Sequence, residues 1–92
     1  MSTQISILPN PFYSTLELEV NVENNASAIV QLFDQQKNII RMLKWNLKKG
    51  TNKTSIEGLG NLPPGDYFVE IKNMDANNLF ATKLVKLDKP FL

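Results

Sequence analysis

The chemistry that this 92-residue chain can perform is limited by its carboxylates and by the absence of two residue types. Glu17 and Glu19 alternate with apolar residues, so they project from one face of a strand, about 6.5–7 Å apart. Two carboxyl groups act as acid and base only where their surroundings keep one protonated and the other ionised. The short loops expected here form no cleft that would do so. The chain also contains no histidine and no cysteine, which removes the usual general base, the cysteine nucleophile and the commonest zinc ligands. We therefore expect no enzyme, no metal site and no cofactor.

A basic interval between residues 41 and 53 is the second candidate for chemistry. It holds Trp45 and five cations without an acid: Arg41, Lys44, Lys48, Lys49 and Lys53. Basic groups beside an aromatic ring are how single-stranded nucleic acid is held. The net charge of +1 gives little long-range attraction, however, and Glu17 and Glu19 are available as partners across the sheet. We interpret the interval as a solvated edge, with Trp45 packed at the core or its rim, and expect no nucleic-acid partner.

Alternating apolar and polar residues predict that the elements carrying these groups are strands. Leu16, Leu18, Val20 and Val22 share one face of the clearest segment, and Tyr67, Val69 and Ile71 share a face of another. Turn-forming residues separate seven such segments: 5–8, 15–22, 28–33, 39–47, 53–59, 67–72 and 79–87. This spacing is typical of an all-β, Ig-like antiparallel sandwich. We expect its core to contain Leu16, Leu18, Val20, Val30, Leu32, Ile56, Tyr67, Val69 and Ile71.

Residues 28–47 leave a second interpretation open. Their apolar residues also fall near helical spacing, and glutamine, lysine, leucine and methionine are good helix formers. We favour two strands here, because a helix would leave too few strands to cover the second sheet. No window of the chain approaches the roughly 18 apolar residues that a membrane span requires.

Two proline-containing segments have structural explanations. Pro9-Asn10-Pro11 lets the chain turn between strands without leaving ladder donors unpaired, although direct recognition by a partner is an alternative role. The prolines and glycine between Leu62 and Tyr67 force a corner. There we expect the Tyr67 ring to be buried and its hydroxyl to bond to nearby backbone, as in the tyrosine corner of β-sandwiches.

Taken together, these segments resemble the C-terminal sorting domains of the type IX secretion system (type A, Por secretion family), which are Ig-like sandwiches. The resemblance covers about residues 5–87. It is carried, in order, by Pro9-Asn10-Pro11, the alternating strand at 16–20, the strand at 30–34, the G-x-N motif at Gly50 and Asn52, the L-P-x-G-x-Y-F corner with Leu62, Gly65 and Tyr67, and the basic-apolar-apolar-basic motif Lys83, Leu84, Val85 and Lys86. The chain departs from the family pattern at Gln36, where a glycine is usual, and by five residues after the last strand.

The resemblance implies a non-catalytic secretion signal. It implies that the domain passes through the periplasm, is recognised by an outer-membrane shuttle and translocon, and is removed by a surface sortase, so that its cargo is secreted or displayed at the cell surface. We expect residues 5–92 to be the sorting domain, residues 1–4 to be linker or the start of an excised piece, and a cargo domain to precede them in the full-length protein.

The resemblance makes the terminal motif the first candidate for recognition, with residues Lys83, Leu84, Val85 and Lys86. The second candidate for recognition is the segment Pro9, Asn10 and Pro11. The remaining motif residues are expected to support the fold: Gly50, Asn52, Leu62, Gly65 and Tyr67. We expect Lys83 and Lys86 to project to solvent and Leu84 to contact the core. The ordinary role of both lysines is to guard an edge strand against unwanted pairing.

An alternative function is an Ig-like adhesion or carbohydrate-binding module, which needs an exposed aromatic row; the candidates for it are Trp45, Phe68 and Phe80.

Overall fold

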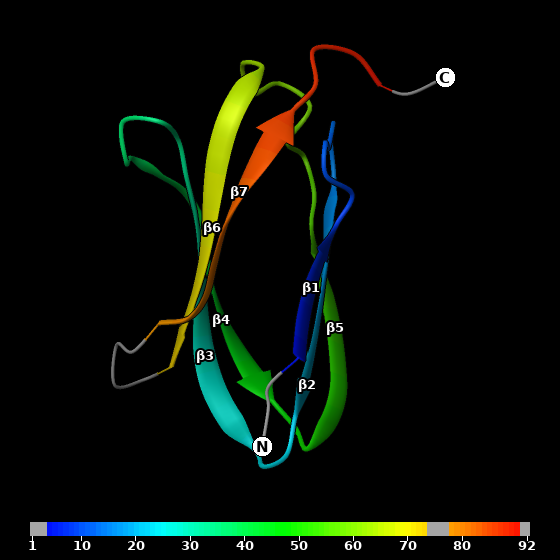
Figure 1. Ribbon diagram of the computed structural model, residues 1–92, viewed down its shortest axis with the longest axis vertical. Helices are drawn as coiled ribbons and strands as arrows, with labels where there is room; N and C mark the ends of the chain where they lie inside the picture. Colours follow the sequence, from blue (N-terminus) through cyan, green and yellow to red (C-terminus); the bar gives the residue numbers. More distant parts are fainter. Residues whose placement is uncertain (1–3, 74–77, 91–92) are drawn as a thin grey trace.

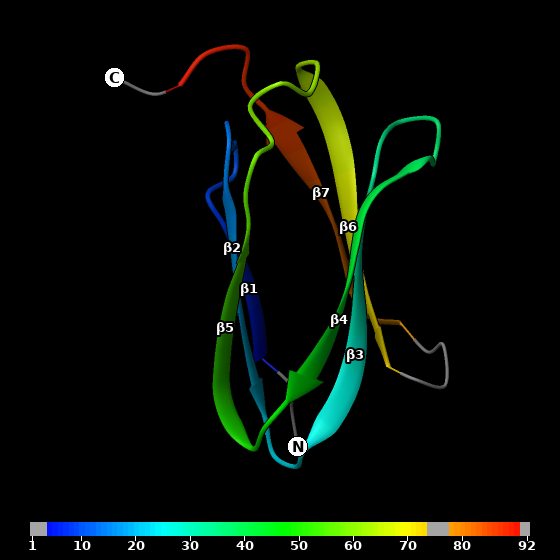
Figure 2. The same cartoon turned by 180° about the vertical axis from the view of Figure 1, so that it is seen from behind.

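The computed structural model describes residues 4–73 and 78–90. This part of the chain contains seven strands and no helix (Figures 1 and 2). The strands are β1 (Gln4–Leu8), β2 (Leu16–Val22), β3 (Ala26–Phe33), β4 (Ile39–Leu47), β5 (Gly50–Ile56), β6 (Gly65–Asn73) and β7 (Asn78–Lys86). Residues 28–47 therefore belong to two strands, as predicted, and the helical alternative is wrong.

The strands form two antiparallel sheets that pack face to face as an Ig-like sandwich (Figures 1 and 2). One sheet has three strands in the order β1-β2-β5, and the other has four in the order β4-β3-β6-β7. The alternation seen in the sequence directs one face of each strand inward. In β2, for example, Leu16, Leu18, Val20 and Val22 are buried while the residues between them are exposed. The all-β sandwich prediction is confirmed.

All nine residues predicted for the core are buried. The sequence pattern did not find Phe12 and Leu59, which are both fully buried but belong to no strand. Their burial follows from the connections. The segment after β1 and the segment after β5 each turn one large apolar side chain into the space between the sheets.

The predicted bounds of the fifth strand were wrong. The strand runs from Gly50 to Ile56, not from 53 to 59, because the register with β2 begins where Gly50 lies opposite Val22. Gly50 has a φ of +104°, a conformation that glycine adopts without strain and that brings the chain out of the preceding turn. The sequence pattern also placed the last strand one residue late, since β7 ends at Lys86.

The turn between β3 and β4 explains how Gln36 fits at a position where the sorting domains that the sequence resembles usually have glycine. The Asp34 carboxylate accepts bonds from the Gln36 N–H at 2.9 Å and the Asn38 N–H at 2.8 Å. The left-handed residue of this turn is the next one along, Lys37, with a φ of +69°. Gln36 therefore occupies ordinary backbone space, and the aspartate holds the turn without a glycine.

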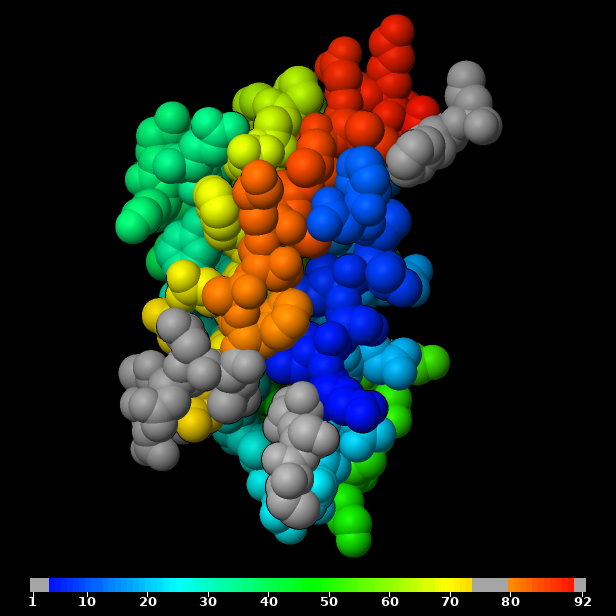
Figure 3. Space-filling model, viewed as in Figure 1, coloured from blue at the N-terminus to red at the C-terminus, as the bar shows by residue number. Residues whose placement is uncertain are grey.

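The segment that follows β1 pairs with the end of β7. After β1 the chain leaves the three-stranded sheet and bonds to β7 of the other sheet. The Phe12 N–H donates to the carbonyl oxygen of Val85 at 2.8 Å, and the Leu87 N–H donates to that of Phe12 at 2.7 Å. Figure 3 shows the N-terminal atoms in blue against the orange atoms of β7. This contact covers part of an otherwise open sheet edge.

We predict that Phe12→Ala destabilises the domain by about 3–5 kcal/mol, because it removes a fully buried ring and leaves a cavity. The nearby Leu8→Ala is the matched control, since Leu8 is 62% exposed and should cost less than about 0.5 kcal/mol. Urea unfolding of both variants measures the difference. Equal losses for the two would contradict the role given to Phe12.

Candidate functional site

The terminal motif is divided between the two faces of β7. Leu84 and Lys86 point inward and are 1% and 2% exposed, whereas the side chain of Lys83 is 60% exposed and Val85 is 38% exposed. Alternation along a strand produces this division directly. The contact of Leu84 with the core and the exposure of Lys83 were predicted correctly.

Lys86 contradicts the prediction that its ammonium projects to solvent. Its Nζ donates to the carbonyl oxygen of Leu87 at 2.7 Å and, at a longer 3.5 Å, to that of Gly60. The Tyr13 ring centroid lies 4.4 Å from the same nitrogen. Two carbonyl oxygens and the negative face of an aromatic ring thus replace water around the buried cation. Lys86 is a structural residue between the sheets and does not guard an edge.

Asn10 joins the proline segment to the terminal motif. Its Oδ1 accepts a bond from the Val85 N–H at 3.0 Å, and its Nδ2 makes a longer contact of 3.4 Å with the carbonyl oxygen of Lys83. Pro9 and Pro11 have no N–H of their own, so the asparagine side chain supplies the pairing that the backbone here cannot. Two motifs more than 70 residues apart therefore form one site, which we call the terminal site: Pro9, Asn10, Pro11, Lys83 and Val85.

Lys83 lies on the outer face of this site. It is opposite Phe68 in the register of β6 and β7, and its Nζ is 4.0 Å from Oδ2 of Asp66. Both charged groups are substantially exposed, so their attraction is weak. The ammonium is consequently available to a partner.

The G-x-N motif is a turn device and lies apart from the terminal site. Oδ1 of Asn52 accepts a bond from the Lys48 N–H at 2.9 Å, while its Nδ2 donates to the Lys48 carbonyl oxygen at 2.8 Å. Together with the positive φ of Gly50, these bonds hold the β4–β5 turn. That turn lies at the end of the sandwich opposite to the end of β7 (Figure 1).

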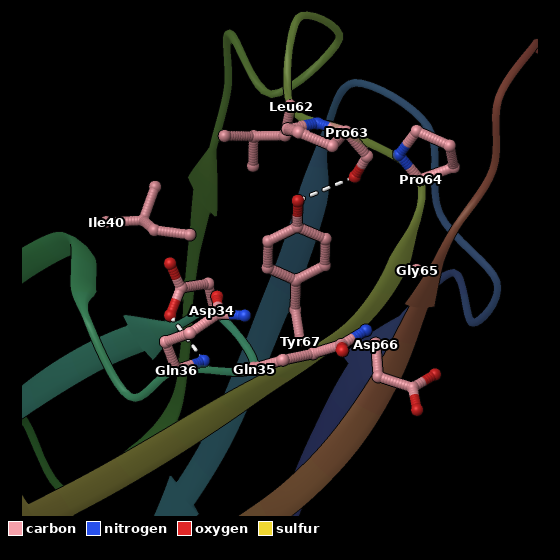
Figure 4. Close-up of a pocket in the computed structure, with 10 residues that line it drawn as sticks. All are labelled: Asp34, Gln35, Gln36, Ile40, Leu62, Pro63, Pro64, Gly65, Asp66 and Tyr67. Carbon is pink, nitrogen blue, oxygen red and sulfur yellow. Dashed lines mark hydrogen bonds between the residues drawn. The ribbon is translucent and has the colours of Figure 1, made fainter.

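The proline corner contacts the segment that carries the terminal site through the rings of Tyr67 and Phe12. The Tyr67 hydroxyl donates to the carbonyl oxygen of Pro63 at 2.6 Å, which confirms the predicted tyrosine corner (Figure 4). The Tyr67 ring meets the Phe12 ring edge to face, with centroids 6.0 Å apart. Gly65 has a φ of +138°, and a Cβ there would lie 3.0 Å from Nε2 of Gln35. Leu62 packs against the core at this corner.

Beside the corner is an open cavity of about 390 Å³, with Asp34, Ile40 and Pro64 in its wall (Figure 4). Bonds from the Asn38 side chain, then from the backbone N–H groups of Asn38 and Gln36, lower the pKa of Asp34. Burial, and then the negative charge of Asp34, raise the pKa of Tyr67. An ionised aspartate and a neutral phenol are the forms that hold the turn and the corner, so neither group is set up to exchange a proton at neutral pH.

The structure disperses the basic interval. Lys53 pairs with Glu19 at 3.8 Å on the outer face of the three-stranded sheet, which is the cross-strand partnership expected for Glu19. Arg41 instead reaches the Gly58 carbonyl oxygen at 3.4 Å. Lys44 lies opposite Ile29 on β3, in the other sheet. These cations therefore do not form the continuous strip that nucleic-acid backbone requires.

The aromatic row of the carbohydrate-binding alternative does not form from its three candidates. Trp45 and Phe80 are partly buried and pack against the core, as expected for Trp45, while Phe68 is 36% exposed. Sequence reasoning also missed Tyr13 and Gly60, which surround Lys86. The one sequence signal for Tyr13 is its position directly after the proline segment and Phe12, which could have indicated that its ring lies near β7.

The fold defines the chain as an Ig-like β-sandwich module. Residues of two of its motifs meet in the terminal site, where the segment after β1 pairs with β7. A sequence model described as the secretion system C-terminal sorting domain matches residues 6–86. The chain belongs to this family, the C-terminal sorting domains of the type IX secretion system. No curated protein matches the chain. Within residues 4–73 and 78–90 there is no helix long and apolar enough to cross a membrane.

We predict that the Tyr67 hydroxyl makes stability depend on alkaline pH. Its pKa is raised from the ordinary 10.0, so its contribution is complete below pH 10.0 and is lost as pH rises through the higher folded-state value. Tyr67→Phe should cost about 0.5–1.5 kcal/mol at neutral pH and remove this part of the alkaline slope. Urea unfolding across the alkaline range measures both. An unchanged slope in Tyr67→Phe, with Tyr13→Phe as the control, would refute the assignment.

The two lysines of the terminal motif should respond differently to charge reversal. Lys86→Glu would bring a buried carboxylate against carbonyl oxygens and the ring face, and we expect a loss of about 3 kcal/mol or more. Lys83→Glu faces solvent and Asp66, and should cost less than about 1 kcal/mol. Thermal and urea unfolding of the single variants give the comparison. Similar losses for both would show that Lys86 is not confined as described.

Proposed function

We propose that residues 5–92 are a non-catalytic sorting domain that directs an N-terminal cargo domain through the type IX secretion machinery. Membership of the family implies export across the outer membrane to a secreted or cell-surface state. The finer proposal is that the folded domain crosses the periplasm, is recognised there through protein–protein contacts by an outer-membrane shuttle and translocon, and is removed by a surface sortase. Gln4 already belongs to β1, so the residues before it then serve as linker to the cargo.

The observation that carries this proposal is the docking of Asn10 on β7. A partner that touches the outer side of β7 at this point meets both family motifs at once. Because the two motifs come from opposite ends of the chain, their common surface exists only in the folded domain. A recognition step that reads this surface therefore selects cargo whose signal has folded.

Residue roles within the terminal site follow from exposure. Lys83 and Val85 present an ammonium and an apolar group to solvent, so we assign them to contact with the machinery. Leu84 and Lys86 are buried, so we assign them to holding β7 in place. Pro9, Asn10 and Pro11 position the edge of β7 and border the same surface. The adhesion or carbohydrate-binding alternative gains no support, because two of its three aromatic candidates pack against the core.

Residues 5–92, placed after a signal peptide and an inert reporter, should carry the reporter to the surface of a host that has this secretion system. Lys83→Glu should reduce surface delivery while the melting temperature stays nearly constant, because the group is exposed. Leu84→Ala should impair delivery only together with stability, at a cost of about 2–5 kcal/mol for a residue that is 1% exposed. Surface proteolysis and cell fractionation measure delivery.

Lys49→Glu is the matched control for Lys83→Glu. It makes the same charge change at an exposed lysine in the β4–β5 turn, far from the terminal site. A wild-type reporter that remains in the periplasm with its domain folded and uncleaved would contradict the sorting function. Normal delivery of Lys83→Glu would instead return this lysine to the role of edge guard.

A further inference from the structure

The outer face of the four-stranded sheet carries most of the exposed large hydrophobic side chains of the described residues. The described part of the chain exposes five large hydrophobic side chains, and four of them, Ile39, Met42, Phe68 and Val85, lie on strands of this sheet. Their register partners place all four on its outer face, because Ile39 lies opposite Phe33, Met42 opposite Gln31, Phe68 opposite Lys83 and Val85 opposite Asp66. Clustered exposed apolar groups of this kind mark interaction sites.

One row of side chains crosses the whole sheet. Ile39, Phe33, Phe68 and Lys83 follow one another from β4 to β7 as direct cross-strand neighbours. The row therefore ends at the exposed lysine of the terminal site, so the apolar face and the terminal site are continuous.

A groove of about 270 Å³ lies on this face, with Phe33, Phe68, Ala81 of β7 and Lys37 of the β3–β4 turn in its wall. This volume is below the about 300–1,000 Å³ of typical small-molecule sites. Its size suits one large side chain of a partner more than a whole ligand. We call the surface formed by Phe33, Lys37, Phe68, Ala81 and Lys83 the groove face.

The charges around the groove favour an acidic partner. Lys37 lines the groove and pairs with no carboxylate among the described residues, while Lys83 has only the weak 4.0 Å contact with Asp66. The acid in the groove wall, Glu70, is paired with Lys72 at 3.4 Å. One available ammonium group, that of Lys37, thus lines the apolar groove, and the other, that of Lys83, belongs to the register neighbour of Phe68 in its wall. Such a surface is complementary to an apolar side chain with carboxylates beside it.

We propose that the groove face docks a segment of a secretion-machinery protein that presents an aromatic or large aliphatic side chain between acidic residues. The inference rests on the proposed sorting function and names the surface and partner chemistry of that step. The apolar side chain enters the groove against Phe33 and Phe68, and the flanking carboxylates meet Lys37 and Lys83. The inward residues Leu84 and Lys86 make no contact with the partner.

Two blocked tripeptides test the chemistry on the isolated domain: acetyl-Glu-Phe-Glu-amide and acetyl-Lys-Phe-Lys-amide. In NMR titrations the acidic peptide should shift the backbone amides of Phe33, Phe68 and Ala81, and the basic peptide should shift them much less. Ala81→Leu, which fills the groove from an exposed position, should abolish the shifts. Ala26→Leu makes the same change at an exposed alanine at the start of β3 and should leave the shifts intact. Equal shifts by both peptides, or none at these amides, would overturn the proposal.

Reporter export tests the same surface in the cell. Lys37→Glu and Ala81→Leu should each lower surface delivery by about tenfold or more, as loss of a central contact does, whereas Lys49→Glu and Ala26→Leu should deliver like wild type. Melting temperatures establish that each variant is folded. Lys37→Glu changes only the charge at the groove and Ala81→Leu changes only its volume, so the test can be made with either variant if the other does not fold. Normal delivery of both folded groove variants overturns the docking proposal and leaves the sorting function standing. Failure of the wild-type domain to export its reporter counts against the sorting function itself.

Discussion

The pairing of Phe12 with β7 is the interaction on which the rest of the structure depends. Two backbone hydrogen bonds, to Val85 and from Leu87, tie the segment after β1 to the last strand. They carry the Phe12 ring between the sheets, where it meets the Tyr67 ring of the proline corner. They also bring Tyr13 over Lys86 and Asn10 against the edge of β7. The terminal site, the tyrosine corner and the buried lysine therefore all depend on this pairing of the segment after β1 with the end of β7, which we call the closure of the sandwich.

This closure gives a physical reason why a signal made of distant motifs can act as one. A strand at a sheet edge exposes unpaired N–H and C=O groups that attract other chains. Asn10 and Phe12 use part of this pairing capacity in β7 within the domain itself, so the side chains of Lys83 and Val85, and not the backbone beside Asn10, are left to make outside contacts. Under the proposed sorting function, recognition at this point would depend on the side chains of Lys83 and Val85 and on the pairing of Asn10 and Phe12 with β7.

The two outer faces of the sandwich differ in character. The three-stranded sheet presents polar and charged groups such as Glu17, Glu19 and Lys53, which is the ordinary solvated face of an antiparallel sheet. The four-stranded sheet presents Met42, Phe68 and Val85 beside charged groups such as Glu70, Lys72 and Lys83. The four-stranded sheet therefore has the more apolar of the two outer faces, and Lys83 and Val85 of the terminal motif lie on it.

Local pattern alone determined most of the fold. Period-two alternation identified seven strands and nine core residues, because a half-buried strand records its inward face in its own sequence. Tyr67 and its corner were also predictable, since two prolines and a glycine restrict the backbone there. Tertiary structure decided what depends on contact between distant segments. Phe12 and Leu59 are buried from connections that have no periodicity. Lys86 is buried because a tyrosine and two carbonyl oxygens replace its water, and no sequence pattern records that arrangement. The union of Asn10 with β7 and the apolar row across the four-stranded sheet exist only once strand order and register bring their residues side by side.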